Sequence, residues 1–291
     1  MSAKYPIISV TGSSGAGTTS VRRTFEQIFR RERIEAAYIE GEAFNRYDRA
    51  EMSTVMAQEE SKGNRNFSDF GPSANLLAEL EAVFRSYHES GAGKTRHYVH
   101  DDEEAAFYGC APGTFTNWVA LPENSDLLFY EGLHGAVKAD RVNISQYPDL
   151  KIGVVPVINL EWIQKIHRDC SARGYSTEAV MDTMLRRMPD YVHYVCPQFT
   201  ETDINFQRVP TVDTSNPFAA RWIPTADESM VIIRFAKPRG IDFSYLHSMI
   251  HDSFMSRANS IVIPGAKLDL AMQLILTPFV LQLVERHRRA G

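Results

Sequence analysis

The chain has 291 residues, 44% of them hydrophobic and 23% charged, and carries a net charge of −5 at pH 7. This composition is typical of a globular protein with a large core, and the negative charge argues against a nucleic-acid-binding protein, which needs a broad basic surface. The three cysteines are widely spaced, which favours neither a disulfide framework nor a zinc site. Because we find neither a signal peptide nor an apolar run of ~20 residues, we expect a cytoplasmic protein without membrane contact.

The first predicted strand, residues 7–10, runs directly into a glycine-rich turn. Gly12 and Gly17 have the spacing of a P-loop, in which backbone N–H groups converge on a phosphate. The helix that follows points the positive end of its dipole at the same anion. The alternative is an ordinary glycine-rich connection between a strand and a helix that binds no phosphate. The predicted phosphate-binding residues are Gly12, Ser13, Ser14, Gly15, Ala16, Gly17, Thr18, Thr19 and Ser20.

The turn departs from the usual P-loop at one position. Thr18 stands where the motif has a lysine, whereas Thr19 keeps the Ser/Thr position that presents a hydroxyl to Mg²⁺. The missing lysine predicts that a cation reaches the phosphates from elsewhere in the chain.

A second strand over 36–39 ends in the polar run Glu-Gly-Glu. Polar groups at the carboxyl end of a strand in such a sheet face the ligand crevice. Glu42 is therefore a candidate acid/base, and a solvated loop carboxylate is the alternative. Asp48 and Glu51 have the spacing of a capping box at the start of a helix.

Two further elements precede the middle of the chain. A helix is predicted to start at 71–73 and to carry an apolar face as far as Tyr87. The segment 94–100 (KTRHYVH) predicts an edge strand that turns polar groups toward the site, with a polar surface strand as the alternative. Those groups are Arg96, Tyr98 and His100.

Residues 127–132 (LLFYEG) give the second strong signal. Four apolar residues that lead to an acid have the form of a Walker B strand, whose carboxylate reaches Mg²⁺ at the strand's end. We therefore expect Glu131 to be a metal ligand. A buried strand followed by a surface acid is the alternative. His134 is expected near the same crevice.

The next strand, over 149–159, leads into a densely charged segment, 161–175. Its ionisable side chains include Lys165, His167, Arg168, Asp169 and Arg173. Such a run is usually a solvated helix face. Because the P-loop lacks its lysine, we expect instead a lid that closes over the phosphates and supplies the missing positive charge. Another amphipathic helix is predicted over 177–188.

The last third of the chain is predicted to alternate strands and helices. Strands are expected at 206–214, 230–235 and 260–264, and helices at 246–255 and 268–289. Pro278 is expected to kink or split the last helix, because proline removes a backbone hydrogen bond. We find no repeat, low-complexity tract or linker, so the whole chain, 1–291, is predicted to be a single α/β domain.

Five sequence blocks resemble the bacterial-type phosphoribulokinases, which are P-loop kinases. They are GSSGAGTTS at 12–20, FYEGLHG at 129–135, VINLEWIQKIHRD at 157–169, INFQRVPTVDTSNPF at 204–218 and GIDFSYL at 240–246. The resemblance implies a nucleoside-monophosphate-kinase-like mixed sheet flanked by helices. It also implies ATP and Mg²⁺, and phosphorylation of the C1 hydroxyl of ribulose 5-phosphate to ribulose 1,5-bisphosphate, a Calvin-cycle reaction. A homo-octamer that responds to NADH and AMP is implied as well.

The same resemblance implies roles for individual residues. Glu42 would be the catalytic base, Lys165 the missing cation and Asp169 a second functional carboxylate. Residues 12–20 would bind ATP, with Thr19 and Glu131 on the metal. The implied sugar-phosphate contacts are Asn45, Arg49, Tyr98, His100, His134, Arg168 and Arg173. The implied effector residues are Arg31, Arg234 and Arg257.

Two departures from the family pattern fall on one turn. The family has Glu-Gly-Asp-x-Phe-His after the second strand, whereas this chain has Glu42 for the aspartate and Asn45 for the histidine. The extra methylene shifts the carboxylate by roughly 1 Å, and a misplacement on that scale costs about a hundredfold in rate. A kinase of the same fold for another sugar phosphate or a nucleoside is therefore the alternative, followed by a nucleotide-binding regulatory homologue.

Overall fold

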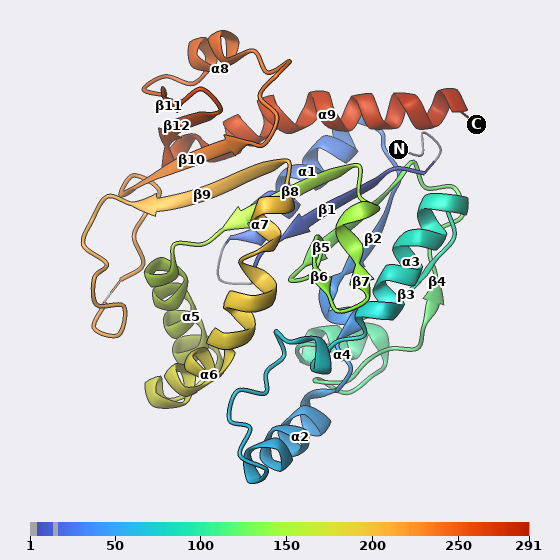
Figure 1. The fold of residues 1–291 in the computed structure, drawn as a ribbon, viewed down its shortest axis with the longest axis vertical. Helices are drawn as coiled ribbons and strands as arrows, with labels where there is room; N and C mark the ends of the chain where they lie inside the picture. The colour runs from blue at the N-terminus through green and yellow to red at the C-terminus, as the bar shows by residue number, and fades with distance from the viewer. Residues whose placement is uncertain (1–4, 14–16, 221, 291) are drawn as a thin grey trace.

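The computed structural model describes residues 5–13, 17–220 and 222–290, apart from the side chains of Thr19, Ala172 and Arg173. Eight strands form one mixed sheet (Figure 1). From one edge to the other they are β2 (Ala36–Glu40), β5 (Leu127–Gly132), β1 (Ile7–Thr11), β8 (Leu150–Val155), β9 (Ile204–Pro210), β10 (Ser229–Phe235), β12 (Ser260–Pro264) and β11 (Phe254–Arg257). The first five run parallel and the last three pair antiparallel, which confirms the predicted mixed sheet.

The centre of the sheet is the predicted P-loop strand. All five residues of β1 are buried, and it lies between β5 and β8 with Ile8 opposite Phe129 and Leu150. Continuous apolar strands of this kind are typical of a parallel sheet that is covered on both faces. The carboxyl ends of β2, β5, β1 and β8 therefore meet at one edge, where the polar runs that follow them are brought together.

One face of the sheet is covered by α1 (Thr18–Glu32) and α9 (Leu268–Ala290), which lie side by side (Figure 1). Phe25 and Ile28 of α1 share a core with Met272 and Leu276 of α9. The prediction that Pro278 splits the last helix is wrong, since α9 is continuous through it. Buried side chains on both sides of the proline hold the two halves on the same core.

The segment Gly265–Ala290, which contains α9, is long and apolar enough to span a membrane by length and composition. Its apolar character has another cause in this fold, because one face of the helix is part of the main core. The buried residues of that face are Ala271, Met272, Ile275, Leu276, Val280 and Val284.

The other face of the sheet is covered by α3 (Leu77–Ser90), whose residues Leu80, Phe84 and Tyr87 are fully buried. The helix starts later than predicted, because Pro72–Ala74 forms a separate 3₁₀ turn. The predicted capping box is confirmed at the start of α2 (Arg49–Ser61), where the carboxylates of Asp48 and Glu51 each accept a hydrogen bond from the backbone N–H of the other residue.

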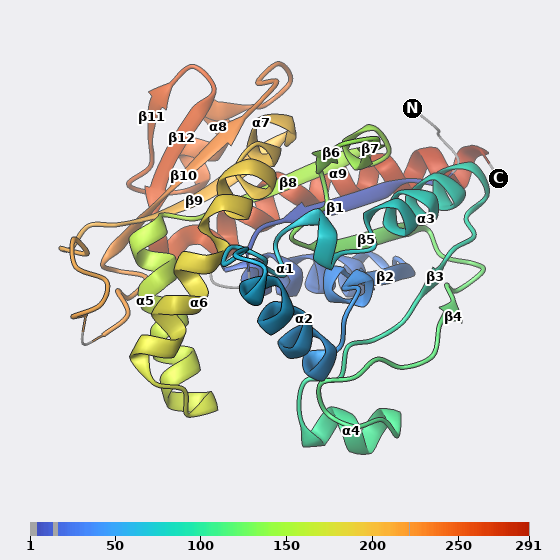
Figure 2. The ribbon, with the colours of Figure 1, turned by 60° about the horizontal axis from the view of Figure 1, so that its bottom comes forward.

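Two helices, α5 (Ile158–Arg173) and α6 (Thr177–Asp190), stand side by side and project away from the sheet (Figure 2). We call them the lid helices. They pack on each other through Ile166, Val180 and Met184. The segment 161–175, in which we expected a lid, is therefore helical as far as Arg173, and α6 runs two residues beyond the predicted end. A π-helical turn (Tyr191–Val195) and α7 (Gln198–Glu201) lead back to the sheet.

Further predicted elements have different boundaries, and the strand predicted over 206–214 is β9, which ends at Pro210. Only Lys94–Thr95 of the segment 94–100 is a strand (β3), and it pairs with β4 (Val119–Ala120) outside the main sheet. The strand predicted over 149–159 ends at Val155, since Pro156 has no N–H to donate. The helix predicted over 246–255 is replaced by α8 (Phe243–Met249) and the edge strand β11. The remaining short elements are α4 (Asp102–Tyr108), β6 (Lys138–Ala139) and β7 (Val142–Asn143).

The role of α9 as a core helix can be tested at Leu276, which is fully buried. Leu276→Ala should lower the free energy of unfolding by about 2–5 kcal/mol, the range for a buried leucine that leaves a cavity. Leu270, on the same helix and 39% exposed, is the matched control and should cost less than about 1 kcal/mol when changed to alanine. Urea unfolding of both variants measures the difference, and equal costs would contradict the core assignment.

Candidate active site

Two glycines give the P-loop its shape. A side chain at Gly12 would place its Cβ 2.9 Å from both Thr18 Cγ2 and the Val154 carbonyl oxygen, so no larger residue fits. Gly17 has a φ of 98° in the left-handed region and caps α1. Both predicted glycines are thus required by the backbone. Ser14, Gly15 and Ala16, also predicted to bind phosphate, lie outside the described residues.

Thr18, which occupies the lysine position, has a different task from the lysine it replaces. Its side chain is buried and hydrogen-bonds the carboxylate of Glu131 at the end of β5. The P-loop helix and the predicted Walker B strand are therefore joined directly. The side chain of Thr19, the other predicted metal ligand, lies outside the described residues.

Glu131 is the carboxylate best placed for a cation. Burial raises its pKa, and the Thr18 hydrogen bond and the Arg22 guanidinium, 3.9 Å away, oppose that rise. Its carboxylate thus has a hydroxyl and one distant cation as partners, an arrangement that suits a hard divalent ion. No group of three or more metal-ligating side chains occurs among the described residues. A single carboxylate is nonetheless enough for Mg²⁺, which is usually bound by one or two carboxylates, water and substrate phosphates.

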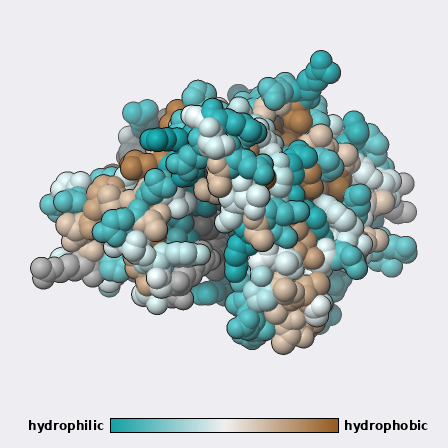
Figure 3. Space-filling view, turned by 90° about the horizontal axis from the view of Figure 1, so that it is seen from below, coloured by the Kyte–Doolittle hydropathy of each residue, from teal (hydrophilic) through white to brown (hydrophobic). Residues whose placement is uncertain are grey.

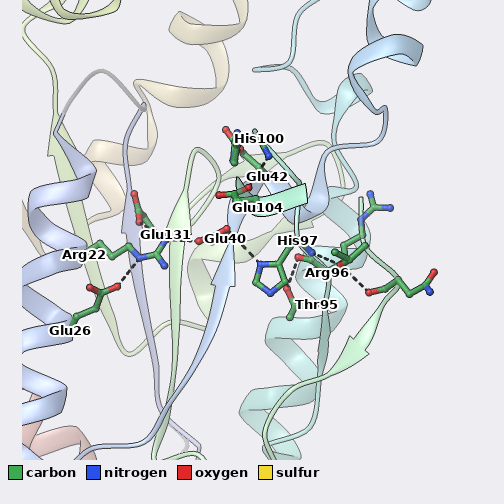
Figure 4. A network of polar contacts seen from close by, with 12 residues as sticks. Arg22, Glu26, Glu40, Glu42, Thr95, Arg96, His97, His100, Glu104 and Glu131 are labelled. Carbon is green, nitrogen blue, oxygen red and sulfur yellow. Dashed lines mark hydrogen bonds and ion pairs between the residues drawn. The ribbon is translucent and has the colours of Figure 1, made fainter. Parts of the chain in front are cut away.

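Arg22 of α1, which the sequence did not single out, joins several carboxylates beside Glu131 (Figure 4). Its guanidinium donates to Glu40 at 2.5 Å and to Glu26 at 2.9 Å. Burial opposes the charge on Arg22, yet these carboxylates outweigh that effect and raise its pKa. His97 lies 3.9 Å from Glu40 on the opposite side and stacks on Tyr108. Neither Arg22 nor His97 has a local motif that could have indicated this role.

Four predicted residues are brought together beyond the end of β2. The Glu42 carboxylate lies 2.9 Å from Nε2 of His100 (Figure 4). The His100 ring packs edge-on against Tyr98 at 5.1 Å, and its carbonyl oxygen accepts a hydrogen bond from Arg49. The hydrogen bond that the His100 ring donates to Glu42 raises the pKa of His100, although partial burial works against it. These four residues therefore form one connected cluster around His100, and such a cluster could bind one small substrate.

Arg96 was expected to face the site, and this prediction is wrong. Its guanidinium donates to the backbone carbonyl oxygens of Ala43 and Asn45 and lies over the Phe115 ring at 3.6 Å. It therefore fixes the main chain that carries Glu42. Asn45, a predicted substrate contact, also forms a backbone bridge with Asn75.

The predicted lid cation lies in an ion pair on α5. Lys165 Nζ is 2.6 Å from Asp169, whose side chain is only 5% exposed, and Arg168 contacts the same carboxylate at 3.0 Å. Burial alone would raise the pKa of Asp169, but Lys165 and Arg168 more than offset it and hold that pKa below its ordinary value. All three residues belong to the predicted set. The side chain of Arg173 lies outside the described residues.

His134 is not brought together with the other predicted substrate contacts. Its ring is buried, donates from Nε2 to the Phe70 carbonyl oxygen at 3.0 Å, and has its pKa lowered by burial. The three predicted effector residues also lie on separate elements. Arg31 on α1 contacts Gln273 and Thr277 of α9, Arg234 on β10 reaches the Phe199 carbonyl oxygen, and Arg257 is exposed on β11.

Comparison with known proteins places the chain among its relatives. Residues 7–215 match the model of the phosphoribulokinase / uridine kinase family. A phosphoribulokinase of Nitrobacter vulgaris is 76% identical over 287 residues, 99% of each chain, and the chromosomal phosphoribulokinase of Cupriavidus necator is 68% identical over the full length of both. The solved phosphoribulokinase from Rhodobacter spheroides superposes with a TM-score of 0.91 at 62% identity, over 99% of this chain and 100% of that one.

The chain belongs to the phosphoribulokinase / uridine kinase family. It is a kinase, a phosphotransferase with an alcohol acceptor, on the P-loop kinase fold that the sequence predicts. The predicted site residues fall mainly into three groups: the P-loop side with Glu131, the segment beyond β2 with Glu42, and the lid helix α5 with Lys165. The face that carries the lid helices and α4 is largely hydrophilic and is hollowed between them (Figure 3).

The Glu42–His100 pair predicts the titration of one histidine in this kinase. His100 should titrate above its ordinary pKa of 6.5, and Glu42→Gln should lower that pKa. The pair then stabilises the folded protein fully below pH 6.5, and its contribution disappears as the pH rises through the folded-state pKa. NMR of ¹³C-labelled histidines measures the titration, with His100→Gln for assignment. Glu104→Gln should shift the pKa of His100 less, because the Glu104 carboxylate accepts a hydrogen bond from the His100 backbone N–H and not from its ring. An unchanged His100 pKa in Glu42→Gln would contradict the pairing.

Proposed function

We propose that this kinase transfers the γ-phosphoryl group of ATP to the C1 hydroxyl of ribulose 5-phosphate and so forms ribulose 1,5-bisphosphate. The observation that carries the proposal is the arrangement at the end of β2 and β5. Glu40 is paired with Glu131 across these strands, and Glu42, two residues further on, lies against His100. An acceptor held by Glu42 is thus next to phosphates held by the P-loop. Relatives named phosphoribulokinase, up to 76% identical over the whole chain, support the choice of acceptor.

ATP would bind with its phosphates on residues 12–20. A pocket beside Gly17 and Ser20 has apolar walls that include Val157 and Phe206, together with the Arg208 guanidinium. We place the nucleotide base there, since it is the described pocket that adjoins the P-loop. Apolar walls with a few polar groups are what a heteroaromatic ring requires.

Mg²⁺ would be held by Glu131 and by the hydroxyl of Thr19. When bound, it would neutralise charge on the phosphates and orient them. The chain's own contribution is to keep Glu131 beside the P-loop through Thr18, and to fix Glu40 through Arg22 so that it does not compete for the same position.

Glu42 would accept the proton of the attacking hydroxyl. General-base assistance of this kind contributes about 10²–10⁴-fold. His100 holds the carboxylate in place, and Asn45, Arg49 and Tyr98 are the nearest candidates to bind the sugar phosphate. Arg168 and Arg173 would add charge from the lid, with His134 in a supporting position behind the site.

Lys165 would replace the P-loop lysine. It lies one turn after Glu161 on α5, and Glu161 hydrogen-bonds Ser13 of the P-loop, so the same helix face is turned toward the phosphates. Asp169, one turn further, keeps the ammonium in position through the 2.6 Å contact. Phosphoryl transfer depends mainly on positioning and on neutralising charge, so this cation would act directly on the transition state.

The other parts of the resemblance stay predictions. We propose a homo-octamer with a small-molecule sugar phosphate as substrate, a cytoplasmic location, and a response to NADH and AMP through Arg31, Arg234 and Arg257. A single domain over 1–291 also stays a prediction. The main alternative, a kinase for another small acceptor, is favoured by Glu42 and Asn45, where the chain departs from the family pattern.

The acceptor is tested with the variants of that turn. If ribulose 5-phosphate is the substrate, the parent should phosphorylate it, Glu42→Asp should retain activity and Glu42→Ala should lose at least about a hundredfold. We would measure kcat/KM across pentose phosphates, pentulose phosphates and nucleosides with Mg²⁺, including the double variant Glu42→Asp with Asn45→His. A parent inactive on ribulose 5-phosphate and not rescued by the double variant would overturn the proposal.

The lid cation is tested at Lys165. Lys165→Met should lower kcat by at least about a hundredfold, the scale of losing one donor that acts on the transition state. Lys62→Met is the matched control, because Lys62 also pairs with a carboxylate on its own helix but is exposed and remote from the P-loop. Steady-state kinetics and thermal unfolding of both variants separate catalysis from folding. Near-normal turnover in Lys165→Met would show that the charge comes from another residue.

A further inference from the structure

A buried carboxylate at the base of the lid lines the pocket in which we place the nucleotide base, but it has no role in the chemistry described above. Glu161 lies in the first turn of α5 and is 7% exposed. It accepts a hydrogen bond from the Ser13 hydroxyl and another from the Tyr191 hydroxyl at 3.2 Å. A carboxylate in such a position is costly unless it is hydrogen-bonded, so both contacts are needed to keep it there.

The three side chains come from three parts of the fold. Ser13 belongs to the P-loop, Glu161 starts the first lid helix, and Tyr191 follows the end of the second. All three are buried. The two points where the lid helices leave and rejoin the rest of the chain are thus tied, through one carboxylate, to a hydroxyl of the phosphate-binding turn.

The surroundings of this contact are apolar on the side of Tyr191. The Tyr191 ring packs on Phe70 at 6.2 Å and belongs to a small core with Val195, against which Ile158 of α5 is packed. Burial raises the pKa of Glu161, and the hydrogen bonds from Ser13 and Tyr191 oppose the rise. A low local dielectric strengthens satisfied hydrogen bonds and makes an unsatisfied one expensive.

We infer that Glu161 is a positioning residue, which couples the base of the lid helices to the P-loop by holding Ser13 and Tyr191 together. The inference rests on the proposed ATP site. It means that nucleotide affinity depends on a residue whose carboxylate is hydrogen-bonded to two hydroxyl groups of the protein. It also means that the lid helices and the phosphate-binding turn move as one unit at this point.

The experiment compares Glu161→Met with Ser13→Ala and with the double variant. Methionine keeps the length of the side chain but accepts neither hydrogen bond, and it suits the apolar neighbours. We expect Glu161→Met to weaken binding of a non-hydrolysable ATP analogue, measured by calorimetry with Mg²⁺, about tenfold, and to raise the KM for ATP likewise. The KM for the sugar phosphate should stay within about twofold. Glu161→Gln, which keeps one acceptor, should fall between the parent and Glu161→Met.

The coupling is read from the double variant. If Glu161 acts through Ser13, the double variant should bind the ATP analogue as tightly as Glu161→Met alone, because the effects of substituting two contacting residues are not additive. Independent, additive losses would overturn the inference. So would unchanged nucleotide affinity in Glu161→Met with only a lower melting temperature, which is what a purely structural role predicts.

Two controls keep the result interpretable. Glu178→Gln changes an exposed carboxylate in the first turn of α6 and should leave nucleotide affinity unchanged. If Glu161→Met does not fold, Tyr191→Phe removes only one hydroxyl and should weaken binding of the ATP analogue about threefold. An unchanged affinity in Tyr191→Phe would contradict the inference. A parent that binds the analogue but does not phosphorylate ribulose 5-phosphate would refute the proposed acceptor while leaving this test intact.

Discussion

The site depends on a close backbone contact between two glycines at the ends of neighbouring strands. A Cβ at Gly41 would lie 2.8 Å from the Cα of Gly132, and one at Gly132 would lie 2.6 Å from the Cα of Gly41. Only two residues without side chains can approach in this way. The Gly132 carbonyl oxygen also accepts from the N–H of Gly12, so the P-loop is attached to the same point. Because the backbones of Gly41 and Gly132 approach so closely, Glu42 and Glu131 lie next to each other and next to the phosphate-binding turn.

The missing P-loop lysine changes how positive charge reaches the phosphates. A lysine in the turn would be fixed beside them, whereas Thr18 uses that position to hold Glu131. In the site that we propose, the cation comes from α5, where Lys165 is already paired with the ionised Asp169. The charge is therefore carried by a helix outside the sheet, and its place relative to the phosphates is set by what anchors that helix. The Glu161–Ser13 contact is such an anchor.

Local patterns in the sequence predicted the elements whose structure is decided locally. The P-loop strand, the capping box at Asp48 and the apolar strand ending in Glu131 were all confirmed. Contacts between distant residues were not predictable, since nothing near Glu161 indicates a partner 148 residues away. The prediction for Arg96 failed for the same reason: a short run rich in aromatic and cationic residues suggested an edge strand, but Arg96 donates to carbonyl oxygens of the Glu42 segment.

That binding also bears on the two departures from the family pattern. Arg96 holds the backbone at Ala43 and Asn45, so the turn that carries Glu42 is positioned by its main chain and not by the side chain at position 45. The longer side chain of Glu42 is held in one position, because its carboxylate lies 2.9 Å from the His100 ring. His100 in turn packs against Tyr98, and its carbonyl oxygen accepts a hydrogen bond from Arg49. Glutamate reaches one methylene further than aspartate would from the same backbone position. The contact with His100 fixes that longer side chain, and in the site that we propose it keeps a carboxylate on the acceptor side.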